Sequence, residues 1–437
     1  MLIQQFRDAV YHKFSQRPDA TMDLLDALTI ARHVESPVAL STESPFRRHF
    51  SSVYDVLAQK PFEPQPLHQL LHDAQPSDAE CVAGFRVYAV DTTPNERPAA
   101  ETLPDRGLLK DQVDEPARIG FKFSWLARLV QRGTSWIAPW DVCRVPTNQT
   151  ENQSARQQVA ALAQIEKTPT VIVADSRYAS HIFLGLFATV RQLFALVRLR
   201  NNQVLYERPV PKQPGARGAA RKHGPRLKLA APTRPPDRSA QWQVAGQAVQ
   251  LQAWLGVHLK KLPTLVGLVL KVEFLKPDGS PRYRHPIWLF WTGDATLNLA
   301  DLARMYLWRF ALEHGFRFLK QHLGLNANRS AELISVERWM WLSALAYWQL
   351  LLMRSAVTNL RPAWHPRTPP GESALLTPGQ VQRGAARFLV GLGTPAGSTR
   401  RAGKGRGRQA GYRPMARTRY PVVRKSQRAV LASKKQT

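Results

Sequence analysis

The stretch DLARMYLWRFALEHGFRFLKQHLG, residues 301–324, has the spacing of one α-helix with two opposed faces. At about 100° per residue, positions three or four apart return to the same side of a helix. Polar side chains recur at these intervals, and apolar side chains fill the other side. The pattern predicts one helix that packs on a core and presents a polar stripe. The stripe consists of Tyr306, Arg309, Glu313, Arg317 and Lys320, opposite Leu307, Trp308, Ala311, Leu312, Phe318 and Leu319.

Two aspartates stand at the ends of predicted strands elsewhere in the chain. Asp91 follows the run RVYAV, and Asp175 follows the wholly apolar run TVIVA. A strand that is apolar throughout is typical of the centre of an α/β sheet, and strand ends are where such sheets form sites. A single aspartate in this position is also a common helix cap or turn residue. Two of them, together with Glu313 in a cationic stripe, make a candidate acidic triad.

The pattern Tyr306-x2-Arg309-x3-Glu313-x6-Lys320 resembles the YREK signature of bacterial insertion-sequence transposases, whose DDE catalytic domain has an RNase H-like fold. The resemblance extends to the VDTTP and VADSRY segments that contain the two aspartates. It also covers the long interval before Glu313, which holds a β-rich insertion in this group. It implies that the three acids bind metal and that the Tyr, Arg and Lys of the signature contact DNA.

The resemblance also implies a chemistry for these residues. Two Mg²⁺ ions, with Mn²⁺ as a substitute, would be held by oxygen ligands from Asp91, Asp175 and Glu313. One ion lowers the pKa of the attacking oxygen, and the other stabilises the departing oxyanion. Unscreened carboxylates this close repel one another, so we expect all three to be ionised only in the loaded site. Arg309 suits a phosphate, Lys320 adds a point charge, and Arg317 is expected to extend this DNA track.

The composition of the chain limits the partners and cofactors that it is expected to bind. Lys and Arg number 61 against 32 Asp and Glu, a net charge of +29, which favours nucleic acid as the partner over a membrane surface. The two cysteines, Cys81 and Cys143, allow neither a Cys-rich zinc site nor a disulfide framework. The apolar run 339–353 is short for a membrane span, and the amino-terminal residues lack a signal-peptide core. We expect a cytoplasmic bacterial protein that uses no nucleotide cofactor, since no full P-loop is present.

The predicted fold class is α/β, with an RNase H-like core interrupted by a β-rich insertion. Strands are expected at 86–90, 121–126, 136–145, 170–174 and 193–199, and helices at 153–167 and 179–190. Residues 94–117 are expected to form a surface loop. The predicted segments are a helical region that either grips DNA or covers the catalytic domain (1–78), the first catalytic part (79–208), a basic loop and β-rich insertion (209–295), the last catalytic part (296–357), and a basic, largely disordered tail (358–437).

The composition of the chain supports the assignments of the basic loop, the β-rich insertion and the basic tail. Residues 212–238 contain eight Lys or Arg and five Pro, as expected of an exposed loop. Residues 242–291 have strand patterns, with Pro277-Asp278-Gly279 as a hairpin turn. Four insertion tryptophans could stack on DNA bases, but core packing is the better interpretation for most. After Glu372 the chain has fifteen Lys or Arg and no acid, and much of it is Gly-rich. The tryptophans are Trp242, Trp254, Trp288 and Trp291.

The predicted function is a cut-and-paste DNA transposase that binds the ends of its own element, cleaves them and inserts them elsewhere. A homodimer in the DNA complex follows from the family and from the need to hold two ends. Alternatives are an RNase H-like nuclease without strand transfer, a catalytically silent transposase-derived DNA-binding protein, and a basic architectural or RNA-binding protein. Rival acids are Asp294 and Glu273, and Asp141 also lies in the sheet region.

Overall fold

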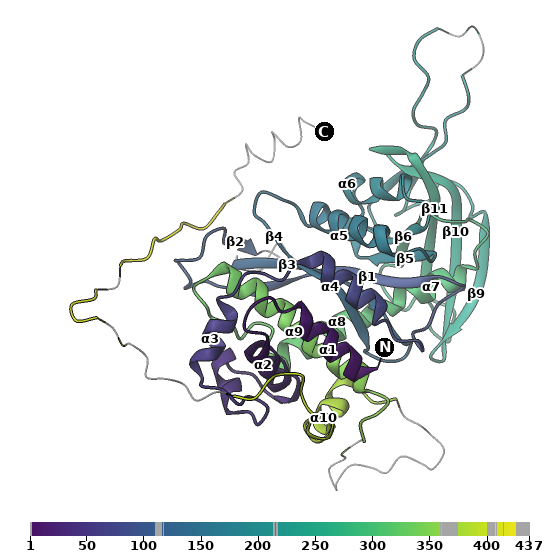
Figure 1. Ribbon diagram of the computed structural model, residues 1–437. Helices are drawn as coiled ribbons and strands as arrows, with labels where there is room; N and C mark the ends of the chain where they lie inside the picture. The colour runs from purple at the N-terminus through teal and green to yellow at the C-terminus, as the bar shows by residue number, and fades with distance from the viewer. Residues whose placement is uncertain are drawn as a thin grey trace.

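The apolar runs of the chain assemble into one mixed sheet with helices on both faces, as the computed structural model shows (Figure 1). Within the described residues the sheet has twelve strands, in the order β2-β3-β1-β5-β6-β12-β11-β10-β7-β8, with β4 on β3 and β9 on β10. The strands at the outer end of this order are β7 (Val204–Glu207) and β8 (Arg226–Lys228). The described residues are 2–109, 116, 118–212, 215, 217–358, 360, 375–399, 407, 409–413 and 415–424.

Five strands form the part of the sheet that carries the predicted acids. In spatial order they are β4, β3, β1, β5 and β6; β1 is antiparallel to β3 and parallel to β5. This arrangement is compatible with an RNase H-like core. The bounds are β1 (Arg86–Glu96), β3 (Arg118–Leu129), β4 (Ile137–Val145), β5 (Thr170–Ala174) and β6 (Leu193–Leu199).

The predicted strands are all present, and the bounds of β5 and β6 are as predicted. The expectation of a loop over 94–117 is wrong in part, because β1 continues to Glu96 and β2 (Gly107–Leu109) follows. Pro94 is tolerated in a strand here because β1 pairs with β5 only as far as Val90, and beyond that point β3 is its only strand partner among the described residues. The predicted helix over 179–190 is also wrong. Its residues form a single turn, α6 (His181–Leu184), and a 3₁₀ turn, η3 (Gly185–Ala188).

Helices cover opposite faces of this core. On β3, the Ser124 hydroxyl donates to Gln158 of α5 (Glu151–Ile165), whereas the Trp125 ring packs edge-on against Phe316 of α8 (Phe310–Gln321). Successive strand residues point to opposite faces, so α5 and α8 lie on opposite sides of the sheet (Figure 1). Helix α9 (Leu333–Met353) packs on β4, which α8 also contacts. The two helices meet where the Phe318 ring packs edge-on against the Tyr347 ring.

The β-rich insertion extends the same sheet. Strand β12 (Ile287–Trp291) pairs with β6, and β11 (Leu262–Phe274), β10 (Gln247–Leu259) and β9 (Arg238–Val244) follow outward. The predicted turn lies between β11 and β12, with Gly279 at φ +80°. Three of the four insertion tryptophans, Trp254, Trp288 and Trp291, are buried, so they pack in the core as expected.

Residues 2–73 form helices that pack mainly on α9 and β4. Pro18 and Pro37 stand at helix starts, where the missing N–H costs nothing. The buried Arg7 of α1 donates to Asp26 of α2 and to Gln349 of α9, which connects this region to α9. No helix in the described part of the chain is long and apolar enough to cross a membrane. The remaining elements here are α1 (Ile3–Lys13), α2 (Pro18–Ile30), η1 (Pro37–Thr42), α3 (Ser51–Leu57) and α4 (Pro64–Asp73).

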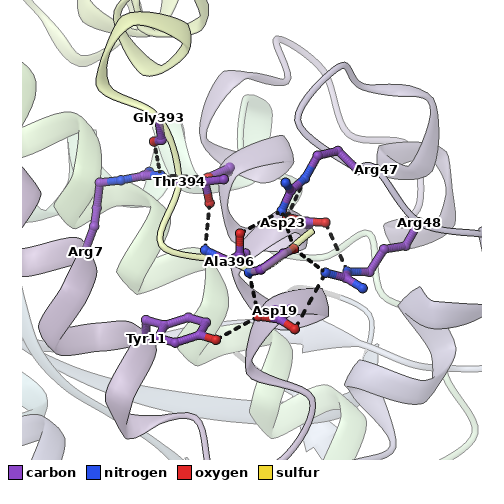
Figure 2. A network of polar contacts seen from close by, with 11 residues as sticks. Arg7, Tyr11, Asp19, Asp23, Arg47, Arg48, Gly393, Thr394 and Ala396 are labelled. Carbon is purple, nitrogen blue, oxygen red and sulfur yellow. Dashed lines mark hydrogen bonds and ion pairs between the residues drawn. The ribbon is translucent and has the colours of Figure 1, made fainter. Parts of the chain in front are cut away.

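Part of the segment predicted as a disordered tail is ordered. Helix α10 (Pro378–Leu392) begins with a capping box of Thr377 and Gln380 and buries one apolar face against α2 and α9. The next residues lie across α1 and α2, where the Gly397 N–H donates to Asp19 (Figure 2). Further on, the Val423 N–H donates to the Arg106 carbonyl beside β2. The rest of the predicted tail, including 361–374, 401–406 and 425–437, lies outside the described residues.

Candidate active site

Asp91 and Asp175 are brought together by strand pairing. Strands β1 and β5 run parallel with Val90 opposite Ala174, so the next residue on each strand is an aspartate. Asp91 accepts a hydrogen bond from the Thr92 N–H at 2.8 Å. Asp175 accepts one from the Arg177 N–H at 2.8 Å and so caps the 3₁₀ turn η2 (Ser176–Tyr178). Asp175 therefore has the capping role expected of an isolated aspartate, and it also lies beside Asp91.

The prediction of one continuous helix over 301–324 is wrong. The structure has α7 (Leu299–Trp308) and α8, with a break at Arg309. At the break the Arg309 N–H donates to the Tyr306 carbonyl and the Leu312 N–H to the Arg309 carbonyl, so two successive bonds span three residues instead of four. This tightening turns the Arg309 side chain toward the sheet.

Arg309 joins the third acid to the first. Its Nη1 lies 3.0 Å from Asp91 Oδ2, and its Nη2 lies 2.6 Å from Glu313 Oε1. The Arg309 and Asp91 side chains are only 13% and 18% exposed, whereas Glu313 is 42% exposed at the rim. One guanidinium thus bridges a carboxylate of the sheet and a carboxylate in the first turn of α8, where the helix dipole favours negative charge.

The electrostatics of Asp91 reflect this crowding. Burial raises its pKa to about 6; Arg309 opposes the increase, and the carboxylates of Asp175 and Glu313 add to it. The charges of Asp175, at the end of β5, and of Glu313, on α8, therefore both act on Asp91 of β1.

The other members of the stripe have different environments. Tyr306 is buried and only 6% exposed, and its ring centroid lies 5.9 Å from the Arg309 guanidinium carbon. Burial raises the pKa of Tyr306, which keeps its hydroxyl protonated. Arg317 is exposed and Lys320 is half-buried. The structure thus places Tyr306 beneath Arg309 and leaves Arg317 on the surface of α8.

The donor chemistry of the site suits a hard divalent cation, because Asp91, Asp175 and Glu313 offer only carboxylate oxygens. No group of three or more His, Cys, Asp or Glu side chains among the described residues is arranged to hold a metal ion, however. Two of the carboxylates are engaged by Arg309 instead. The acids fit a cation by chemistry, but in this conformation an arginine supplies the positive charge.

The rival acids have structural roles away from this site. Asp294 accepts hydrogen bonds from the Thr296 N–H and hydroxyl, Glu273 pairs with Lys271, and the buried Asp141 pairs with His68. Each of these acids is already satisfied by a neighbour on its own or an adjacent element.

One further acid near the site was not foreseen. The pKa of the buried Tyr178 is raised first by burial and then by the charges of Asp91, Glu151 and Asp175. Glu151, in the first turn of α5, lies 2.5 Å from Lys122 and 4.0 Å from Arg177. The Thr150 cap of α5 was the available signal, because it starts the helix two residues earlier than the predicted start.

In the N-terminal region, Arg47 and Arg48 are engaged by Asp23, with Arg47 at 2.7 Å and Arg48 at 3.1 Å (Figure 2). The Arg47 guanidinium also donates to the carbonyls of Ala396 and Gly397. Arg47 and Arg48 therefore make contacts that connect the N-terminal region to the segment after α10.

The family model described as DDE superfamily endonuclease matches residues 9–259, more than half of the chain. The matched span contains Asp91 and Asp175, and it ends before α7 and α8, so Glu313 and the polar stripe lie outside it. No curated protein matches the chain.

Proposed function

This chain belongs to the DDE superfamily endonucleases, and we propose that within this family it acts as a DNA transposase of the bacterial insertion-sequence type. Membership makes it an enzyme of the nuclease or transposase class with DNA as its substrate. The proposal goes further: the chain would bind the ends of its own element, cleave them and join them to a target. The Tyr-Arg-Glu-Lys spacing of the stripe supports this finer assignment.

The observation that carries the proposal is the convergence of Asp91, Asp175 and Glu313 around Arg309. Glu313 lies 222 positions after Asp91 in the sequence, yet one guanidinium contacts both carboxylates. Desolvation offsets much of the Coulombic gain of a partly buried ion pair, so stability alone does not explain two carboxylates held on one cation. Metal-assisted phosphodiester chemistry provides that use.

We assign Asp91, Asp175 and Glu313 as the residues that would hold two Mg²⁺ ions, with Mn²⁺ as a substitute. When bound, such ions activate the attacking oxygen and stabilise the departing oxyanion. Arg309, once it leaves the acids, is suited to hold a phosphate oxygen through two donors. Lys320 and Arg317 would contact the DNA backbone along α8. The protonated Tyr306 would pack against Arg309 and hold it in position.

The proposed reaction has two steps, cleavage and strand transfer. In cleavage, a water oxygen attacks phosphorus, the P–O3′ bond breaks, and the 3′-oxygen leaves as a hydroxyl while the 5′-phosphate keeps the water oxygen. In strand transfer, the freed 3′-hydroxyl attacks a target phosphate and displaces the target's own 3′-oxygen. We propose that two copies of the chain hold two ends during these steps, in the bacterial cytoplasm and on the nucleoid.

The decisive experiment is Mg²⁺-dependent cleavage of a DNA duplex that carries the sequences flanking this gene. Wild type is compared with Glu313→Gln, which keeps the shape of the side chain and removes its charge. We expect specific cuts at the flanks that disappear in the variant, and joining of pre-cut ends to a plasmid. Cutting without joining would favour the nuclease, and binding without cutting would favour the silent DNA-binding protein.

A further inference from the structure

A basic arm extends from the outer edge of the sheet. We use this term for the described residues between positions 208 and 228, namely 208–212, 215 and 217–228, which connect β7 (Val204–Glu207) to β8 (Arg226–Lys228) and include β8. Strand β8 is the last strand of the sheet order on this side. Figure 1 shows the arm as the teal loop that projects from the sheet at the upper right. Because the arm leaves the body of the protein, a long ligand can approach it from several sides.

Strand pairing and close backbone contacts fix the base of the arm. Leu205 and Leu227 pair across β7 and β8 and are fully buried. The Gly224 N–H donates to the Glu207 carbonyl at 2.9 Å, and a Cβ at Gly224 would lie only 2.3 Å from the Arg208 carbonyl oxygen, so the two sides of the arm are in close contact there. The direction of the arm is therefore set by the sheet.

The arm carries a concentration of cations without counter-charges. Seven Lys or Arg occur between positions 208 and 228, no acid occurs between 208 and 236, and all seven are exposed. Within the described part of the chain none of the seven forms an ion pair, and the nearest acid, Glu207, is already paired with Arg234 at 2.9 Å. The seven are Arg208, Lys212, Arg217, Arg221, Lys222, Arg226 and Lys228.

Several arginines elsewhere in the described part of the chain are paired with acids. Arg86 lies 2.8 Å from Glu166 and Arg144 lies 2.7 Å from Glu337. Like charges held together on one projection repel one another, and nothing within the arm relieves this repulsion. A polyanion would relieve it, because each phosphate that is neutralised releases counterions from the nucleic acid.

The composition of the arm selects among nucleic acids. Between 208 and 228 the only ring capable of stacking is His223, which packs on Tyr206 at 4.8 Å at the base. Single-strand binders pair their positive charge with aromatic platforms for unstacked bases, and the arm has none at its outer end. Its exposed Lys and Arg suit the regularly spaced phosphates of a duplex.

We infer that the basic arm grips the phosphate backbone of duplex DNA outside the cleavage site, independently of base sequence. This inference rests on the proposed DNA substrate and adds a second contact surface to it. The arm would hold DNA flanking the scissile position and would contribute salt-sensitive affinity instead of sequence choice.

The test measures the binding of a random-sequence 30-bp duplex by fluorescence anisotropy, in EDTA, as a function of salt. The arm variant carries Lys212→Gln, Arg217→Gln, Arg221→Gln and Lys222→Gln. The control variant removes the same charge from exposed lysines elsewhere. We expect the slope of log affinity against log salt to fall by about 0.9 for each lost contact in the arm variant, up to about 3.6, and by less than about one in the control. The control carries Lys13→Gln, Lys60→Gln, Lys167→Gln and Lys276→Gln.

Equal slopes for the two variants would overturn the inference. A second measurement places a photoreactive benzoylphenylalanine at Val210, which is 84% exposed, or at Val390 on α10, which is 79% exposed. Crosslinking of the duplex at position 210 and not at 390 supports the arm, and equal crosslinking overturns it. This outcome can be distinguished from failure of the proposed function. An arm-dependent slope without Mg²⁺-dependent cleavage would support DNA binding by the arm and contradict the proposed function. Cleavage with an unchanged slope would overturn only the inference about the arm.

Discussion

The Arg309 guanidinium donates to Asp91 at 3.0 Å, and its other terminal nitrogen donates to Glu313 at 2.6 Å. One arginine at the break between α7 and α8 therefore neutralises two of the three acids. A divalent cation that uses the same carboxylates has to compete with this arginine. DNA phosphates that attract Arg309 would remove the competitor, so DNA and metal should each strengthen the binding of the other.

Replacing Arg309 with glutamine should strengthen metal binding in the absence of DNA. The variant loses the cation that occupies Asp91 and Glu313, and we expect Mn²⁺ affinity to rise by about tenfold, or about 1.4 kcal/mol. Electron paramagnetic resonance of free Mn²⁺ measures this without any catalytic turnover. The matched control is Arg304→Gln, which breaks an arginine–aspartate pair with Asp301 on α7. Unchanged Mn²⁺ affinity in Arg309→Gln would contradict the competition.

The sequence predicted the centre of the sheet well because continuous apolar runs leave few alternatives. The strand ending at Ala174 has its predicted bounds, and the parallel pairing of Val90 with Ala174 brings Asp91 beside Asp175. The break at Arg309 was not predictable from periodicity, since the residues before and after it both follow the helical repeat. Its side chain is held by a carboxylate 218 positions earlier in the chain, which local patterns do not contain.

The missed helix α10 has a different cause. Its basic, Gly-containing surroundings suggested disorder, but Val381, Ala385 and Leu389 recur every four residues and are buried. The cap at Thr377 was also visible in the sequence. The periodicity of α10 is a better guide to its structure than its composition, because the helix is stabilised by tertiary contacts with α2 and α9.

Gly315 should tolerate no large side chain. It lies two residues after Glu313, and a Cβ there would lie 2.5 Å from Ile137 Cδ1 on β4. We expect Gly315→Val to lower the free energy of unfolding by about 2 kcal/mol through overpacking, and to reduce DNA cleavage by displacing Glu313. Urea denaturation measures the first effect, and Ile137→Ala should partly restore both. The control is Gly391→Val on α10, where nothing lies within 4 Å; an equal loss there would show that valine in a helix, and not the contact, is responsible.

The contact between Asp19 and the segment after α10 should make stability depend on pH. A hydrogen bond from the Tyr11 hydroxyl and one from the Gly397 N–H hold the pKa of Asp19 below its usual value (Figure 2). A lowered pKa stabilises the folded state above the unfolded pKa of about 3.9, and this contribution is lost as pH falls further. Asp19→Asn keeps an acceptor oxygen and removes the titration. The melting temperature of wild type should exceed that of Asp19→Asn above about pH 4 and converge with it below; a constant difference from pH 3 to 6 would contradict this.

Removing Arg7 should strongly destabilise the folded chain, because the buried Asp26 carboxylate would lose the cation that neutralises it. Arg7 is fully buried and Asp26 is 4% exposed, and Arg7 also donates to Gln349 and to the Gly393 carbonyl. Truncating one member of a buried ion pair costs about 3 to 5 kcal/mol, whereas replacing both members with apolar residues costs much less. We therefore expect Arg7→Met to lower the free energy of unfolding by about that amount, and Arg7→Met with Asp26→Leu to recover part of it. Additive losses in the double variant, measured by urea denaturation, would mean that the pair itself contributes nothing and that each side chain acts through its other contacts.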